Sequence, residues 1–182
     1  SNVTKSGFTE LNITIGGNGT NETFSGEQEV LFFDENYLII NFSHNFSQSS
    51  LDLSNITVTK TITSLIVNFS EQLQGNKTLY ITDNTFVGLC VKDAPISSVS
   101  EITPGCNGGN ETDLTNCLGG SLISNGINCT DLGSTIMIEN LQYSGVKGTQ
   151  ASSTSSTSSG GSGGGGSSGG GSASIKKNIT PK

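Results

Sequence analysis

Short stretches in which apolar and polar residues alternate recur along most of the chain. In the clearest one, residues 37–46, one face of an extended strand carries Leu38, Ile40, Phe42 and Phe46, and the other face carries Asn41, Ser43 and Asn45. Similar runs, rich in Val, Ile, Thr, Phe and Tyr, lie at 11–15, 29–33, 55–59, 61–69, 78–82, 86–92, 127–129 and 135–141. No segment has a helical period, so the pattern predicts an all-β fold of one or two small β-sandwiches.

Composition divides the 182 residues into four parts. Residues 1–17 hold an N-terminal strand, and residues 18–92 hold the strands of a sandwich core. Residues 93–150 are rich in loops and contain the cysteines, and they either complete that core or form a second small domain. Residues 151–182 form a Ser/Thr/Gly-rich extended tail, with a composition typical of O-glycosylated stalks and flexible spacers. Its irregular Ser/Thr blocks favour a natural tail over an artificial linker.

Asn-X-Ser/Thr sequons are more frequent than chance predicts. Ser and Thr are 49 of the 182 residues, so about 5 of the 18 Asn should have one at the second following position. Twelve do: Asn2, Asn12, Asn18, Asn21, Asn41, Asn45, Asn55, Asn68, Asn76, Asn110, Asn128 and Asn178. Where the alternation is clear, as at Asn41 and Asn68, the sequon lies on the polar face. We therefore expect surface N-glycans added in a secretory compartment.

The four cysteines, Cys90, Cys106, Cys117 and Cys129, form an even set within 40 residues. The short paired spacings of zinc sites are absent, and the single histidine, His44, is remote. We therefore expect two disulfides and an oxidising, extracellular environment. Three pairings are available. We favour the nested one, Cys90 with Cys129 and Cys106 with Cys117, because it would tie two strands and close the Gly-rich loop between them.

Charge and hydropathy exclude several partners. The net charge is −7 with only 8 Lys and Arg, which argues against nucleic acid. No apolar run reaches the roughly 18 residues that a transmembrane helix needs. The chain opens on SNVT, so we expect that any signal peptide has been removed or lies outside this sequence.

No pattern in the sequence singles out a catalytic, cofactor or metal site, and we expect no enzymatic activity. His44 lies in a Phe-flanked strand between two sequons, which indicates a surface or structural role. Asp34 and Glu35 read as a turn rather than as the paired carboxylates of a glycosidase. Residues 105–109 lack the ending of a phosphate-binding loop. Calcium could be held by loop acids, although they form no EF-hand pattern; these are Asp83, Asp93, Asp113 and Asp131.

Residues 89–102 read LCVKDAPISSVSEI, and CN at 106–107, NET at 110–112, CTDLG at 129–133 and YSGV at 143–146 follow. This region, roughly 78–147, resembles a module of surface glycoproteins from archaea, notably small-genome uncultivated lineages. The earlier LDL and LYITD phrases are similar to the β-rich segment that often precedes that module. The resemblance implies an extracellular archaeal protein of β architecture with no known active site.

Three function classes fit these features: a filament or pilus subunit, a cell-wall, surface-layer or adhesin stalk module, and a carbohydrate-binding domain. The absence of Trp weakens sugar stacking. Open strand edges accept strands from other chains, and a candidate donor carries Phe8, Leu11, Ile13 and Ile15 before a Gly16-Gly17 hinge. We therefore expect a homopolymeric filament built by strand donation. The alternative is that residues 8–15 pair within their own domain.

Overall fold

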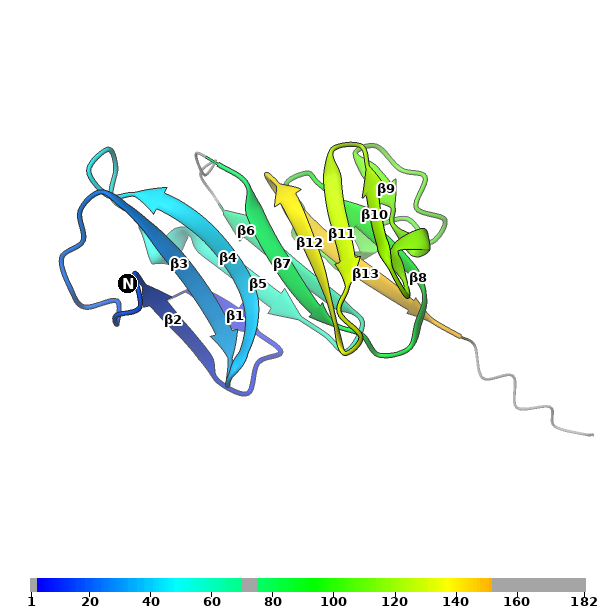
Figure 1. The fold of residues 1–182 in the computed structure, drawn as a ribbon, viewed down its shortest axis with the longest axis horizontal. Coiled ribbons are helices and arrows are strands. Elements are labelled where there is room, and N and C mark those ends of the chain that lie inside the picture. Colours follow the sequence, from blue (N-terminus) through cyan, green and yellow to red (C-terminus); the bar gives the residue numbers. More distant parts are fainter. Residues whose placement is uncertain (1–2, 70–74, 152–182) are drawn as a thin grey trace, which may run out of the picture. The chain divides into compact units, whose positions relative to one another are not determined.

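The computed structural model describes residues 3–69 and 75–151, which form two β-sheets packed face to face (Figure 1). Their strands are β1 Thr4–Ser6, β2 Leu11–Ile15, β3 Glu27–Asp34, β4 Tyr37–Asn45, β5 Ile56–Lys60, β6 Ser64–Phe69, β7 Lys77–Thr82, β8 Phe86–Lys92, β9 Glu111–Asp113, β10 Ser121–Ser124, β11 Ile127–Asp131, β12 Thr135–Leu141 and β13 Ser144–Gln150. Three short 3-10 helices connect them: Leu53–Asn55, Val99–Glu101 and Thr115–Cys117. The predicted all-β sandwich is confirmed.

The two sheets draw strands from distant parts of the chain. The six-stranded sheet has the order β1-β5-β6-β13-β8-β9, and the seven-stranded sheet has the order β10-β11-β12-β7-β4-β3-β2. In the first, β13 lies between β6 and β8; in the second, β12 pairs with β7. Residues 93–150 therefore complete both sheets of the sandwich that residues 18–92 begin.

The core forms because successive strand residues point to opposite faces of a sheet. On β6, Leu65, Val67 and Phe69 face the core, whereas Ile66 faces the other side of the sheet. The same alternation places the buried apolar side chains of both sheets between them, including Val30, Phe32, Ile40, Val58, Leu79, Leu89, Ile136 and Ile138. Burying each such side chain stabilises the fold by about 1.5–3 kcal/mol relative to exposure.

A bulge corrects one detail of the predicted register. In the β3–β4 ladder, Phe32 lies opposite Ile40, but Phe33 lies opposite Leu38. The extra residue, Ile39, is buried, and Leu38 is only half-buried. The expectation that Leu38 shares the core face with Ile40 is therefore wrong, because a bulge shifts all the positions before it.

A second, smaller cluster lies on the outer face of the six-stranded sheet. Ile96 and Ile102, from the loop between β8 and β9, pack there against Ile66 and Cys90. The loop approaches β13 so closely that a Cβ at Gly145 would lie 2.1 Å from Cδ1 of Ile96. The sheet is thus covered on both faces at this point.

Candidate functional site

Ten of the twelve sequon asparagines lie in the described residues, and none of the ten is buried. Six are exposed (Asn12, Asn18, Asn21, Asn55, Asn76 and Asn110) and four are half-buried (Asn41, Asn45, Asn68 and Asn128). Asn2 and Asn178 lie outside the described residues. On the outer face of β4, the Nδ2 group of Asn41 donates a hydrogen bond to Glu29 Oε1 at 2.9 Å. An N-linked amide keeps one N–H, so this bond is compatible with a sugar at Asn41.

The cysteines form two disulfides, but the nested pairing expected from the sequence is wrong. The bonds join Cys90 to Cys106 and Cys117 to Cys129. Cys90 belongs to the small cluster outside the six-stranded sheet, whereas Cys129 lies in the core between the sheets. The sheet itself separates these two sulfurs, so each cysteine bonds to its near neighbour in sequence.

The candidate donor residues lie in an N-terminal arm, defined here as residues 3–15, that contacts both sheets. β1 pairs in parallel with β5, and β2 pairs antiparallel with β3. Ile15 is buried in the core, and Phe8, Leu11 and Ile13 pack against it half-buried. In the isolated chain, residues 11–15 thus form an edge strand of their own domain, which is the arrangement that the sequence left open as the alternative.

The loop acids that could have bound calcium each accept hydrogen bonds from backbone N–H groups. Asp83 accepts from Phe86 at 3.1 Å, Asp93 from Tyr143 at 2.6 Å, Asp113 from Thr115 at 2.9 Å, and Asp131 from Gly119 at 2.6 Å and Gly133 at 2.7 Å. The side-chain and backbone hydrogen bonds of Thr115 lower the pKa of Asp113, and the backbone N–H groups of Gly119 and Gly133 lower that of Asp131. Asp83 and Asp113 therefore cap local turns, whereas Asp93 and Asp131 also fasten segments that are distant in sequence.

One group of potential metal ligands is found among residues 3–69 and 75–151: Cys90, Cys106 and Glu111. The two sulfurs are bonded to each other, so they provide no thiolate. The Glu111 carboxylate instead accepts hydrogen bonds from Thr103 N at 2.9 Å, Thr103 Oγ1 at 2.6 Å and Gly108 N at 2.7 Å. Burial raises the pKa of Glu111, but these donors and Lys92 outweigh it and lower the pKa to about 2. Glu111 thus fastens the 103–108 turn to the sheet.

His44 and the Asp34-Glu35 pair have structural surroundings. Nε2 of His44 lies 2.9 Å from the Ser49 carbonyl oxygen, and its ring packs edge-on against Phe46 at 4.7 Å between centroids. Asp34 forms an ion pair with Lys60, and Glu35 sits in the β3–β4 turn with φ 55°. Neither carboxylate of this pair faces the other across a cleft.

Lys77 is a buried amine that the sequence did not reveal. Its side chain points into the sandwich, where Nζ donates to the Gln142 carbonyl and lies 5.0 Å from the centroid of the Phe69 ring. The loss of hydration lowers the pKa of Lys77 to about 8, although the charge of Asp93 opposes the shift. An alternating pattern Lys77-Leu79-Ile81 on β7 is the signal that could have placed it inward.

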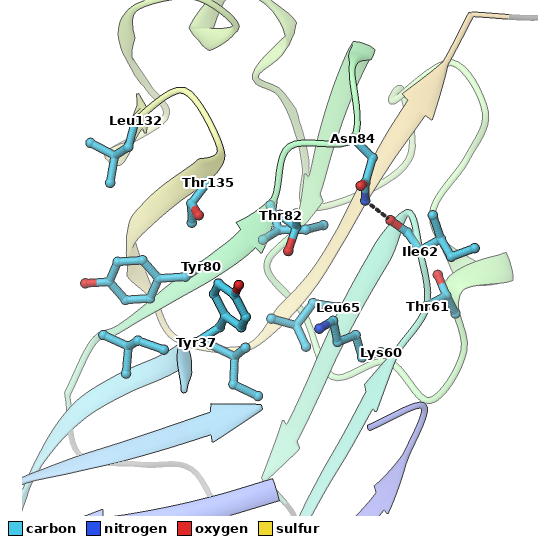
Figure 2. A pocket seen from close by; sticks show the side chains of 13 residues that line it. Tyr37, Lys60, Thr61, Ile62, Leu65, Tyr80, Thr82, Asn84, Leu132 and Thr135 are labelled. Carbon is cyan, nitrogen blue, oxygen red and sulfur yellow. Dashed lines mark hydrogen bonds between the residues drawn. The ribbon is translucent and has the colours of Figure 1, made fainter. Parts of the chain in front are cut away.

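A cavity of about 460 Å³ opens where two strands of the seven-stranded sheet part (Figure 2). The ladder between β4 and β7 ends at Ile40 and Leu79, and residues 37–39 and 80–82 line the cavity without pairing with each other. Lys60, Thr61, Ile62 and Leu65 line it from the six-stranded sheet. Ile62 and Leu132 at its edge are 74% and 57% exposed. The cavity is thus an apolar gap through one layer of the sandwich.

The polar groups of this cavity are mostly uncharged. Tyr37 and Tyr80 line it together with Thr61, Thr82, Thr135 and Asn84, whose Nδ2 donates to the Ile62 carbonyl at 2.6 Å (Figure 2). Burial raises the pKa of Tyr80, and the charges of Glu139 and Glu29 add to this. The Lys60 ammonium is neutralised by Asp34. Aromatic rings beside hydroxyl and amide groups suit a small, neutral, hydroxylated ligand better than an anion.

A comparison of the chain with protein-family models, curated proteins and solved structures found no match. None of the helices in the described ranges has the length and hydropathy that crossing a membrane requires.

Proposed function

We propose that this chain is a structural subunit of an extracellular, N-glycosylated filament, assembled by exchange of the N-terminal arm. Two disulfides support an extracellular location, because such bonds persist in oxidising compartments. Ten sequon asparagines at accessible positions support a glycan coat. The resemblance to archaeal surface glycoproteins points the same way, and it makes an archaeal cell surface the proposed setting.

The observation that carries the proposal is the division of one short arm between two sheets. β1 joins the edge of the six-stranded sheet, and β2 joins the edge of the seven-stranded sheet. Between them the backbone crosses at Gly7, where a Cβ would lie 1.8 Å from the Lys60 carbonyl oxygen. The arm thereby closes one open side of the sandwich. The same arm of a neighbouring copy could make every one of these contacts.

The turn that follows the arm is suited to such an exchange. Ile15 and Asn18 exchange two backbone hydrogen bonds, at 2.9 and 3.0 Å, around Gly16 and Gly17. Both glycines have positive φ, 56° and 82°, which non-glycine residues rarely adopt. If this tight turn opens into an extended connection, the arm projects away from its own domain. Exchange of identical elements is a low-cost route to polymers because it conserves the contacts of the monomer.

Deletion of residues 1–16 tests the proposal. We expect electron micrographs of the full chain to show filaments and those of the truncated chain to show isolated particles. A synthetic peptide of residues 1–16 should bind the truncated chain and raise its Tm, which shows that the remaining sandwich is folded. Filaments of the same form from the truncated chain would refute the exchange of this arm.

Carbohydrate binding is a second candidate function, favoured by the tyrosine-lined cavity between β4 and β7. The ring of Tyr37, which is 71% exposed, can stack on the apolar face of a sugar, and the neighbouring threonine hydroxyls can bond its hydroxyl groups. Titration with neutral oligosaccharides, followed by calorimetry, tests it. We expect Tyr37→Ala to abolish any binding, whereas Val87→Ala, an exposed position outside the cavity lining, should leave it unchanged.

A further inference from the structure

The outer face of the seven-stranded sheet carries apolar side chains in a definite relation to three sequons. Directly opposite residues of paired strands share one face of a sheet and lie about 5 Å apart. Three such pairs join a sequon asparagine to a large apolar side chain: Asn12 with Phe33, Asn41 with Leu31, and Asn128 with Ile123.

The core-facing neighbours of these pairs show that they point outward. The next pair in the β2–β3 ladder is Ile13 with Phe32, and Phe32 is fully buried in the core. Because successive strand residues point to opposite faces, Asn12 and Phe33 face away from the core. Cys129 is buried in the same way next to Asn128. Ile123 is 75% exposed, and Phe33 and Leu31 are half-buried.

We infer that the first sugar of each of these glycans lies flat against the apolar side chain on the neighbouring strand and forms the outer layer of the sheet. This inference rests on the glycosylation in the proposed function. An N-linked sugar begins at the asparagine Nδ2, within reach of the opposite side chain, and its ring has an apolar face of C–H groups. Contact with Phe33, Leu31 or Ile123 removes apolar surface of both partners from water.

Each sugar is bonded covalently to an asparagine on this face, so the sugar is the group that covers the neighbouring apolar side chain. An exposed apolar sheet face would otherwise invite association with other chains. Sequon Asn55 is exposed and lies in the 3-10 helix Leu53–Asn55, outside the strand ladders that pair Asn12, Asn41 and Asn128 with apolar residues. We expect its sugar to extend into solvent without stabilising the sheet, and it provides a matched control.

A double-mutant cycle tests the inference at Asn12 and Phe33. The full chain is produced in a secretory host that attaches N-acetylglucosamine-linked glycans, which are then trimmed enzymatically to the single linked sugar. Mass spectrometry first establishes occupancy at Asn12 and Asn55. Tm is then measured for the parent, Asn12→Gln, Phe33→Thr and the double variant, with Asn55→Gln as the control.

We expect loss of the sugar through Asn12→Gln to lower Tm by a few degrees when Phe33 is present and to have no effect in the Phe33→Thr background. Asn55→Gln should leave Tm unchanged. Equal effects of Asn12→Gln in both backgrounds would overturn the inference, even though the proposed glycosylation would stand. An unoccupied Asn12 in the mass spectrum would instead refute the proposed glycosylation at this site.

Discussion

Lys60 and Asp34 join the two sheets of the sandwich. Nζ of Lys60, at the end of β5, lies 2.5 Å from Oδ2 of Asp34, at the end of β3. Burial raises the pKa of Asp34, but the hydrogen bond and charge of Lys60, with backbone N–H groups of Glu10 and Thr9, lower it below the usual value. The ion pair therefore connects the six-stranded sheet, the seven-stranded sheet and the N-terminal arm at one corner.

We predict that Asp34→Asn lowers the free energy of unfolding by about 1.5–3 kcal/mol at pH 7, the usual range for a hydrogen bond to a charged group. Because the folded-state pKa is depressed, the contribution is complete above the ordinary value of 3.8 and disappears as pH falls through the folded value. Denaturant titrations of D34N, K60M and the double variant measure it. Additive effects of the two single changes would show that the pair is not coupled.

The buried amine of Lys77 predicts a pH dependence of the same sign, but in the alkaline range. Its folded pKa of about 8 lies below the ordinary 10.5, so the unfolded chain binds more protons between these values. The stability of the wild type should therefore rise from pH 8 to pH 10.5 relative to that of Lys77→Met, which has no titratable group. Parallel stability curves for the two proteins over this range would mean that the amine is not desolvated.

Glu111 should control access to the Cys90–Cys106 disulfide. Because its pKa is about 2, the Glu111 carboxylate is ionised and accepts its hydrogen bonds from Thr103 and Gly108 fully above pH 4.5. These hydrogen bonds weaken as the carboxylate is protonated toward pH 2. Reduction of this disulfide by a phosphine, which acts at low pH, should accelerate over that range. For Glu111→Gln it should be fast throughout. A rate that does not depend on pH in the wild type would contradict the assignment.

The two disulfides should differ in their effect on stability. Cys117 and Cys129 lie in the main core, whereas Cys90 and Cys106 fasten a surface loop. Hydrogen exchange should show that replacing the Cys90–Cys106 pair by alanine frees mainly the amides of residues 93–110. The same change at Cys117 and Cys129 should expose amides of β11 and β12 as well. Identical exchange patterns for the two variants would be inconsistent with this structure.

Sequence patterns predicted most of the strands because their core faces alternate, but they missed the short strands β1, β9 and β10 and the longer β13. β13 contains Gly145 and Gly148, and glycine has a low strand propensity. The structure explains both residues: Ile96 occupies the space beside Gly145, and the ring of Phe86 lies 2.4 Å from a Cβ at Gly148. These glycines are required by contacts with residues distant in sequence, and the local sequence does not show such contacts. β13, one of the two central strands of the six-stranded sheet, therefore could not be predicted.

The same limit applies to the sites. The sequons and the even number of cysteines were visible in the sequence, but the pairing was not, because it depends on which face of a sheet holds each sulfur. Likewise, Lys77 reads as a polar residue, and the alternation with Leu79 and Ile81 that places it on the buried face is easily overridden by its charge. The cavity between β4 and β7 forms where the hydrogen-bonded pairing of these strands ends. The residue pattern of either strand alone does not show where that pairing ends.

Disulfide trapping tests arm exchange most directly. Thr14 on the arm lies opposite Leu31 on β3, so Thr14→Cys with Leu31→Cys places two thiols at a distance that a disulfide can bridge. Glu29→Cys with Ser43→Cys, opposite each other outside the arm, is the matched control. After oxidation of assembled protein, the account predicts a ladder of covalent multimers on a non-reducing denaturing gel for the first pair and monomers alone for the control. Monomers alone for both pairs would show that each arm stays in its own subunit, and would contradict the account.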